Sequence, residues 1–292
     1  MTAVRNPKPW RSRRRTAPVS PGGENSGGNG PNPLYSRSAA GCVSAVLITV
    51  GWMAAVILLL AGDGALLARE MLRHAPPERT GLPAAEYAGV GRMTADYLTG
   101  RRERFQHEFL SDTGMPVRCF NAREQAHMAD VRGLIALARA VAFAALCAGL
   151  ALLGWGLFFA GKASLPGPET INGKPAGREA FRRGIRLGLA GLALLASGLA
   201  VWAILNFEGF FVTFHRLAFT NDLWLMDPRT DLIIRLMPTS FFIALGRRGA
   251  LLALLAPAFL LVISRTGCRH RTEGRFFGNK DGSGQGDGSS CP

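Results

Sequence analysis

Long apolar runs alternate with polar segments along the chain, and four of these runs are nearly uncharged: Gly41–Ala61, Gly133–Ala160, Leu187–Leu205 and Gly249–Ile263. A helix needs about 20 apolar residues to cross roughly 30 Å of hydrocarbon. The first three runs meet this length, and Phe241–Leu245 extends the shorter fourth run beyond Arg247 and Arg248. The pattern predicts a mainly α polytopic membrane protein with four transmembrane helices.

Lys and Arg are unevenly divided between the alternate polar segments. If both termini lie inside, the three inner segments hold 18 Lys and Arg against six Asp and Glu, whereas the two outer segments hold 15 against 14. Cytoplasmic segments of membrane proteins carry such an excess of Lys and Arg. We therefore predict a multi-pass cell-membrane protein with both termini cytoplasmic. The net charge of +14 then needs no nucleic acid to explain it, and the alternative of an RNA-binding tail at Arg11–Arg15 lacks interleaved aromatic residues.

Composition also divides the chain into regions. Residues 1–40 are basic and rich in Pro, Gly and Ser, and residues 265–292 are basic and then rich in Gly and Ser, so both are predicted to be disordered cytoplasmic tails. Residues 41–264 form the predicted four-helix membrane domain. Its extracytoplasmic cap is expected to consist of the two outer loops, residues 62–126 and 207–246.

The second span has a clear start signal. Asn121 and Glu124 have the spacing of a capping box, which predicts a helix from Asn121 to Ala160. At 1.5 Å per residue such a helix is about 58 Å long, which exceeds the hydrocarbon thickness. Its first turns must therefore stand outside the membrane, where His127 and Asp130 share a face.

A similar extension is predicted after the third span. Phe207, Phe211 and His215 recur at intervals of four residues, which predicts that the helix of Leu187–Leu205 continues outward and ends near Asn221. On helical rise, His215 lies about 15 Å beyond Leu205, and His127 lies about 18 Å beyond Arg139. The two imidazoles should therefore reach a similar height near the outer membrane surface, among aromatic side chains.

Imidazole titrates near neutral pH and can take or give a proton during acyl transfer. The simpler interpretation of a lone outer histidine is a solvated side chain, and it is our interpretation for three of them: His74, His107 and His270. The alternative interpretation of Asp222, Asp227 and Asp231 as a calcium loop lacks the spacing and glycine of an EF-hand, and helix caps and turns explain them more simply. Neither a GxSxG nor an outer HExxH motif is present, so we expect no metal and no cofactor.

Three segments resemble one protein family. Phe214–Phe242 (FHRLAFTNDLWLMDPRTDLIIRLMPTSFF) resembles the signature of the lipoprotein intramolecular transacylase (Lit) family of four-helix bacterial membrane proteins. Ala126–Arg132 (AHMADVR) is similar to the family's HxxDVK motif, and Glu86–Leu98 to its short Tyr-containing segment. The resemblance covers most of residues 41–265.

The resemblance implies transfer of the sn-2 acyl chain of a diacylglyceryl lipoprotein to the amino group of its own N-terminal Cys, which gives the lyso-form. It assigns catalysis to His127 and His215, at the outer face of the membrane. The expected partners are this lipoprotein and membrane lipids, while the oligomeric state stays open. We expect the substrate to contact residues around the histidines: Tyr97, Asp130, Phe211, Phe214, Asn221, Asp222, Trp224 and Asp227.

Two other classes of function are compatible with the pattern. The chain could be a non-catalytic membrane protein that binds or regulates lipids or lipoproteins. A small transporter is a weaker alternative, because no broken spans or internal repeats support it.

Overall fold

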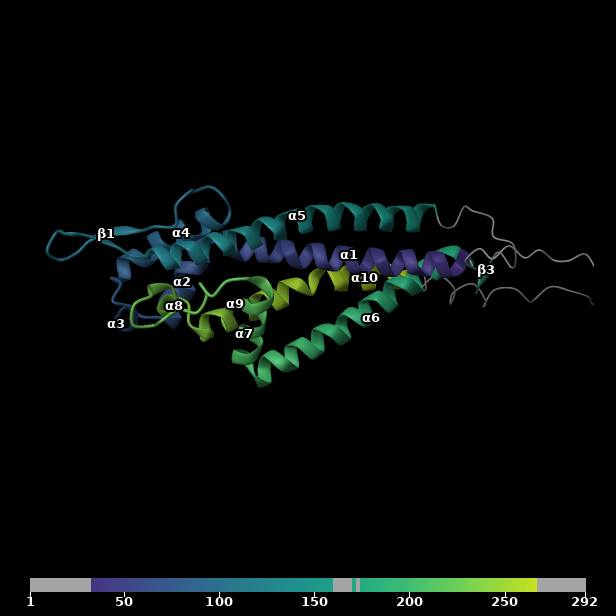
Figure 1. The fold of residues 1–292 in the computed structure, drawn as a ribbon. Helices are drawn as coiled ribbons and strands as arrows, with labels where there is room; N and C mark the ends of the chain where they lie inside the picture. The colour runs from purple at the N-terminus through teal and green to yellow at the C-terminus, as the bar shows by residue number, and fades with distance from the viewer. Residues whose placement is uncertain (1–32, 160–169, 172–173, 267–292) are drawn as a thin grey trace, which may run out of the picture. The chain divides into compact units, whose positions relative to one another are not determined.

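The computed structural model describes residues 33–159, 170–171 and 174–266 (Figure 1). Four helical stretches in this part of the chain are long and apolar enough to cross a membrane: Leu34–Gly62, Ala122–Phe158, Ala176–Leu205 and Thr239–Arg265. The prediction of a mainly α polytopic membrane protein with four spans is confirmed.

The spans are formed by α1 (Pro33–Gly62), α5 (Ala122–Phe158), α6 (Ala176–Leu205) and the pair α9 (Thr239–Ala253) and α10 (Leu255–Arg265). Two helices begin earlier than predicted, α1 at Pro33 rather than Gly41 and α6 at Ala176 rather than Leu187. Counting apolar residues missed these turns because charged residues continue the helices, as where Arg186 pairs with Glu179 at 2.9 Å. Residues 1–32 and 267–292, most of the two predicted tails, lie outside the described residues.

Helix α1 packs against α5, α6, α9 and α10. Ser44 Oγ donates a hydrogen bond to Gly149 O of α5 at 2.9 Å, and Trp52 Nε1 donates to Leu252 O of α9 at 2.8 Å. The approach to α6 is closest, because a Cβ on Gly184 would overlap the backbone carbonyl of Ser38. Small residues allow such backbone proximity between membrane helices.

Successive spans alternate in direction, so the two long connections lie at the same end of the bundle. We call residues 63–121 and 206–238 together the cap (Figure 1). At the opposite end, β3 (Thr170–Ile171) pairs with β4 (Lys174–Pro175). The cap contains five short α-helices, one 3-10 helix and one antiparallel hairpin: α2 (Gly64–His74), α3 (Pro77–Thr80), η1 (Ala84–Glu86), α4 (Tyr87–Leu98), β1 (Glu108–Leu110), β2 (Pro116–Arg118), α7 (Phe207–Ala218) and α8 (Leu232–Leu236).

The buried core of the cap is shared with the spans. Tyr87, Val90 and Met93 of α4 belong to a cluster that also contains Met128 of α5 and Leu236 of α8. Helix α4 covers nearly all of the Tyr-containing segment Glu86–Leu98, whereas the hairpin was not predicted. Because both cap segments and the first turns of α5 contribute to one core, the start of α5 is held in a fixed position relative to α8.

The third span does not continue as one helix to His215, and this prediction was wrong. Asn206 interrupts it with a non-helical backbone, and its Oδ1 accepts a hydrogen bond from Gly209 N at 2.8 Å. Asn206 is therefore the N-cap of a new helix, α7, which leaves the axis of α6 (Figure 1). The i, i+4 pattern of Phe207, Phe211 and His215 belongs to α7 alone.

Candidate active site

His127 lies in the second turn of α5, and the capping box predicted from the sequence is present. Asn121 Oδ1 accepts a hydrogen bond from Glu124 N at 3.0 Å, and Glu124 Oε2 accepts one from Asn121 N at 2.8 Å. His127 is only 8% exposed, and its Nδ1 is buried without a hydrogen-bond partner among the described residues. The first turns of α5 thus hold an imidazole with one nitrogen free.

His215 lies on α7 and is equally buried. Its Nδ1 lies 2.8 Å from Phe211 O, one turn earlier on the same helix. A carbonyl oxygen can only accept a hydrogen bond, so Nδ1 carries the proton and the lone pair of the neutral ring lies on Nε2. Burial lowers the pKa of His215, and the bond to Phe211 O opposes this shift. The contact therefore fixes one tautomer of a predominantly neutral imidazole.

The two imidazoles stack, with ring centroids 6.2 Å apart and an interplanar angle of 29°. Phe219 contacts both rings, at 5.1 Å from His127 and 5.5 Å from His215. Three further rings surround His215 at centroid distances of 4.0, 5.3 and 5.1 Å: Phe211, Phe214 and Trp224. The histidines predicted to meet are therefore neighbours in an aromatic environment.

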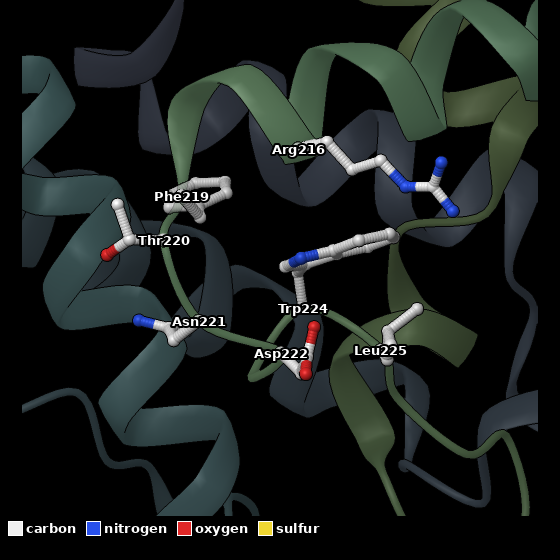
Figure 2. Close-up of a pocket in the computed structure, with 7 residues that line it drawn as sticks. All are labelled: Arg216, Phe219, Thr220, Asn221, Asp222, Trp224 and Leu225. Carbon is white, nitrogen blue, oxygen red and sulfur yellow. The ribbon is translucent and has the colours of Figure 1, made fainter.

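A pocket of about 190 Å³ opens beside this aromatic cluster (Figure 2). Phe219 and Trp224, which contact the histidines, form part of its wall. The other lining residues come from the end of α7 and the following loop: Arg216, Thr220, Asn221, Asp222 and Leu225. A small chemical group bound in this pocket would be separated from the imidazoles only by the rings of Phe219 and Trp224.

The loop that forms the pocket is attached to α5 on both sides of His127. Asn221 Nδ2 donates to Asp130 Oδ2 at 2.9 Å, and Arg123 Nη2 donates to the backbone oxygen of Asp222 at 2.9 Å. The predicted residues Asp130 and Asn221 therefore hold the loop against the helix of His127. The side chain of Asp130 is used in this attachment and does not line the pocket.

Two predicted residues lie away from the histidines. Tyr97 is buried in the cap core, where its ring contacts Phe105 at 5.3 Å and the guanidinium of Arg132 lies 5.0 Å from its centroid. Asp227 forms an ion pair with Arg229 at 2.8 Å. Neither residue has a ring contact or hydrogen bond with His127 or His215 in the described part of the chain.

Sequence reasoning missed three residues that define this site. Phe219 continues the stripe of Phe211 and His215 by one more interval of four, which was a usable signal. Arg216 borders the pocket, but nothing in the local pattern distinguishes it from a solvated arginine. Glu124 was predicted only as a cap residue, whereas its Oε1 also accepts a hydrogen bond from Ile233 N of α8 at 2.7 Å.

The two histidines and the neighbouring pocket are arranged in a way that suits proton transfer at an apolar surface. It provides two buried imidazoles, one with a fixed tautomer, and a small polar pocket next to them. In the described ranges, His, Cys, Asp and Glu side chains form no group of three or more that could hold a metal ion.

Comparisons with known proteins identify the family. The sequence model described as lipoprotein intramolecular transacylase Lit matches residues 42–242. Among solved structures, the in meso structure of the membrane-integral lipoprotein intramolecular transacylase Lit from Bacillus cereus is similar at 18% identity and a TM-score of 0.59, covering 79% of this chain and 95% of that chain.

Two structures of variants of the same Bacillus cereus protein, in which a histidine is replaced by arginine or by alanine, are also similar. Both are 18% identical with a TM-score of 0.57, and they cover 79% of this chain and 91% and 93% of those chains. At this identity the likeness concerns the fold. A comparison with the curated proteins gave no match. Since the family match extends from the first span through the Phe-rich motif of the cap, over more than half of the sequence, the chain belongs to the lipoprotein intramolecular transacylase (Lit) family and is a membrane-integral acyltransferase.

Proposed function

We propose that the chain transfers the sn-2 acyl chain of a diacylglyceryl lipoprotein to the α-amino group of the lipoprotein's own N-terminal Cys, with His127 and His215 as general acid–base groups. Family membership supports the class of reaction. The observation that supports the mechanism is the stacking of the two buried imidazoles, 6.2 Å apart.

The reaction is an aminolysis of an ester. The amine nitrogen attacks the carbonyl carbon of the sn-2 ester, a C–N bond forms, and the C–O bond to glycerol breaks. One proton leaves the amine and one reaches the glycerol oxygen, so the products are an amide and a hydroxyl group. Two titratable groups on either side of the reacting carbon can perform both transfers.

The tautomer of His215 supports a division of these roles. With Nδ1–H donating to Phe211 O, Nε2 holds the lone pair and can take the proton of the attacking amine. The neutral ring of His127 can then pass a proton to the departing alkoxide as it takes one up from protonated His215, so that both rings end neutral. The hydrogen bond that fixes the tautomer of His215 supports our assignment of the base to His215, with His127 as the group that protonates the leaving oxygen.

The aromatic surroundings support the intramolecular nature of the step. Amine and ester belong to one lipid-modified residue, so the enzyme needs to hold them in one orientation rather than bring two molecules together. Correct orientation in such a reaction can supply several kcal/mol of the reduction in barrier. The exposed Phe214 and Leu217 of α7 provide an apolar surface beside the histidines along which acyl chains can lie.

We further propose that the cap lies at the extracytoplasmic face and both termini in the cytoplasm. The support is the excess of Lys and Arg in the three polar segments of the sequence that alternate with the two cap segments: 1–40, 161–186 and 265–292. Reporter fusions test this placement: alkaline phosphatase inserted between Asp112 and Gly114 should be active, and the same enzyme fused after residue 292 should be inactive. The reverse result would contradict the orientation.

The catalytic proposal is tested by expressing the chain with a model diacylglyceryl lipoprotein and locating the acyl chains by mass spectrometry. Wild-type enzyme should yield lipoprotein with an N-acylated Cys and a free sn-2 hydroxyl. His127→Ala and His215→Ala should each lower the rate at least about a hundredfold, the magnitude typical of losing a general acid or base. His107→Ala is the matched control, because His107 pairs with Glu86 elsewhere in the cap. Full activity of either His127 or His215 variant would disprove the two-histidine mechanism.

A further inference from the structure

The segment from Arg216 to Asp231 contains five charged side chains, and most have partners. Asp227 and Arg229 pair with each other at 2.8 Å. The carboxylate of Asp231 accepts hydrogen bonds from Asn121 Nδ2 at 2.7 Å and from Asp227 N at 2.8 Å. Within the described residues, the guanidinium of Arg216 and the carboxylate of Asp222 make no hydrogen bond or ion pair, with each other or with any other group.

Both of these free charges border the same pocket beside the histidines. Figure 2 shows the Arg216 side chain on one side of the Trp224 indole and the Asp222 carboxylate on the opposite side of the same ring. The indole of Trp224 lies 5.1 Å from His215. The pocket therefore offers one cationic and one anionic group, both available to a ligand, next to the imidazoles.

The backbone that presents Asp222 is fixed before any ligand binds. Arg123 donates to the backbone oxygen of Asp222, and the neighbouring Asn221 is held by Asp130, each at 2.9 Å. Asn221 Oδ1 also accepts a hydrogen bond from Leu223 N at 3.1 Å, which stabilises the turn. The carboxylate thus stands on a preorganised loop, and a ligand loses less conformational entropy on binding to such a site.

We propose that this pocket binds the polar N-terminal end of the lipoprotein substrate, with Asp222 holding the α-ammonium group of the Cys and Arg216 holding the first peptide carbonyl. The inference rests on the proposed function, and it specifies which part of the substrate each charge recognises. A primary ammonium donates charge-assisted hydrogen bonds to a carboxylate, and a guanidinium donates to a carbonyl oxygen. The ammonium first releases one proton to solvent, and the base then takes the second proton as the neutral amine attacks the ester.

The size of the pocket supports this part of the substrate. Pockets that enclose a whole drug-sized ligand measure roughly 300–1,000 Å³, whereas this one measures about 190 Å³. It can admit the end of a peptide but not two acyl chains. The acyl chains then lie outside it, against the exposed apolar side chains of α7, and the ester is left at the boundary between the two, beside the imidazoles.

Binding of synthetic peptides to the full-length protein in detergent micelles tests the inference. The two probes are a fluorescent dipalmitoylglyceryl-Cys tetrapeptide with a free amino terminus and its N-acetylated form, which lacks the positive charge. Binding is measured by fluorescence polarisation on the His215→Ala background, so that no turnover occurs. The His215→Ala protein, with the pocket residues unchanged, should bind the free-amine peptide at least about tenfold more tightly than the N-acetylated peptide. A tenfold difference corresponds to about 1.4 kcal/mol of binding free energy.

Two substitutions and their controls separate the charges. Asp222→Asn should reduce the preference for the free amine to less than about twofold, whereas Asp112→Asn, in the exposed hairpin turn, should keep it. Arg216→Gln should weaken both peptides to a similar extent, and Arg216→Lys should restore part of the affinity. Arg229→Gln, which removes a neighbouring arginine outside the pocket, should leave binding unchanged.

Several results would overturn this assignment. If the His215→Ala protein, without a substitution in the pocket, bound both peptides equally, the charge of the amine would not be recognised. This result does not depend on whether the pocket variants fold. A tenfold preference that survives Asp222→Asn would place the ammonium elsewhere. Phosphatidylglycerol, an anionic lipid, could also displace both peptides from the protein with Arg216 but not from Arg216→Gln. In that case the pocket would be a lipid headgroup site instead. Each result is independent of the acyl-transfer assay, so failure of this inference and failure of the two-histidine mechanism are distinguishable.

Discussion

The carboxylate of Glu124 joins two backbone segments that are far apart in the sequence, because its Oε1 accepts the N–H of Ile233 at 2.7 Å. Its other oxygen accepts the N–H of Asn121 at 2.8 Å. Glu124 is 1% exposed and lies one turn before His127 on α5. A single buried side chain therefore fixes the start of the helix of His127 to α8, the helix that follows the pocket loop.

Removal of this carboxylate should destabilise the protein. Glu124→Ala leaves the N–H groups of Asn121 and Ile233 without their acceptors, and each unsatisfied buried group costs about 1–3 kcal/mol. We expect a loss of roughly 2–5 kcal/mol, seen as a lower midpoint of thermal unfolding in detergent. Glu124→Gln keeps one acceptor oxygen and should lose less.

The exposed Glu103 provides the control for this measurement, because surface substitutions without partners usually change stability by less than about 0.5 kcal/mol. A Glu124→Ala variant as stable as Glu103→Ala would show that water replaces both hydrogen bonds.

The break at Asn206 leads to a prediction about activity. Asn206 Oδ1 caps α7, and loss of an N-cap typically costs about 0.5–2 kcal/mol. Asn206→Ala should let the start of α7 fray and move His215 relative to His127, so the acyl-transfer rate should fall about tenfold or more while the protein still folds. Asn206→Asp retains the acceptor and should keep most of the activity. Equal rates for the Ala and Asp variants would contradict a positioning role for the cap.

This break also shows what the sequence could and could not predict. The Asn121–Glu124 spacing correctly predicted the start of α5, because a capping box depends on neighbouring residues alone. The spacing of Phe207, Phe211 and His215 correctly predicted a helix but not its direction. A periodicity of 3.6 residues is the same whether α7 continues α6 or begins after a bend.

In the candidate site, too, some features could be predicted from the sequence and others depend on the fold. The pairing of His127 and His215 was predictable, since both extend from spans toward the same end of a bundle with alternating helices. The partner of Asp227 was not, because a carboxylate two residues from Arg229 reads in sequence like any acidic loop residue. Arg216 could be recognised as a site residue only from the fold, which brings it to the wall of the pocket.

The buried imidazole of His215 should make stability depend on pH. Burial lowers its pKa below the ordinary value of 6.5, so below pH 6.5 the unfolded chain binds more protons than the folded protein. Above about pH 6.5 this group does not change the free energy of unfolding with pH. As pH falls from 6.5 through the lowered pKa of the folded state, its contribution to stability is progressively lost. The loss from one group is at most about 1.36 kcal/mol per pH unit.

The variant His215→Phe removes this titratable group and keeps an aromatic ring among Phe211, Phe219 and Trp224. Its unfolding midpoint should fall less between pH 7 and pH 5 than that of the wild type. Identical pH dependence in the two proteins would mean that His215 is protonated as readily in the folded state as in the unfolded chain.

The contact between α1 and α6 yields a prediction on the membrane helices themselves. A Cβ on Gly184 would overlap the carbonyl oxygen of Ser38, so Gly184→Ala must push the two helix backbones apart. Overpacking of this kind typically costs about 1–3 kcal/mol. Gly191 lies two turns further along α6, and a Cβ there would meet no atom within 4 Å.

Gly191→Ala therefore introduces the same methyl group into the same helix without a clash. It should leave the unfolding midpoint unchanged or raise it, because Ala favours a helix over Gly by roughly 0.5–1 kcal/mol. We expect Gly184→Ala to lower the midpoint in the same detergent. A similar effect of both substitutions would mean that the close approach of Gly184 to Ser38 does not determine how α1 and α6 pack, and that the helices separate at little cost.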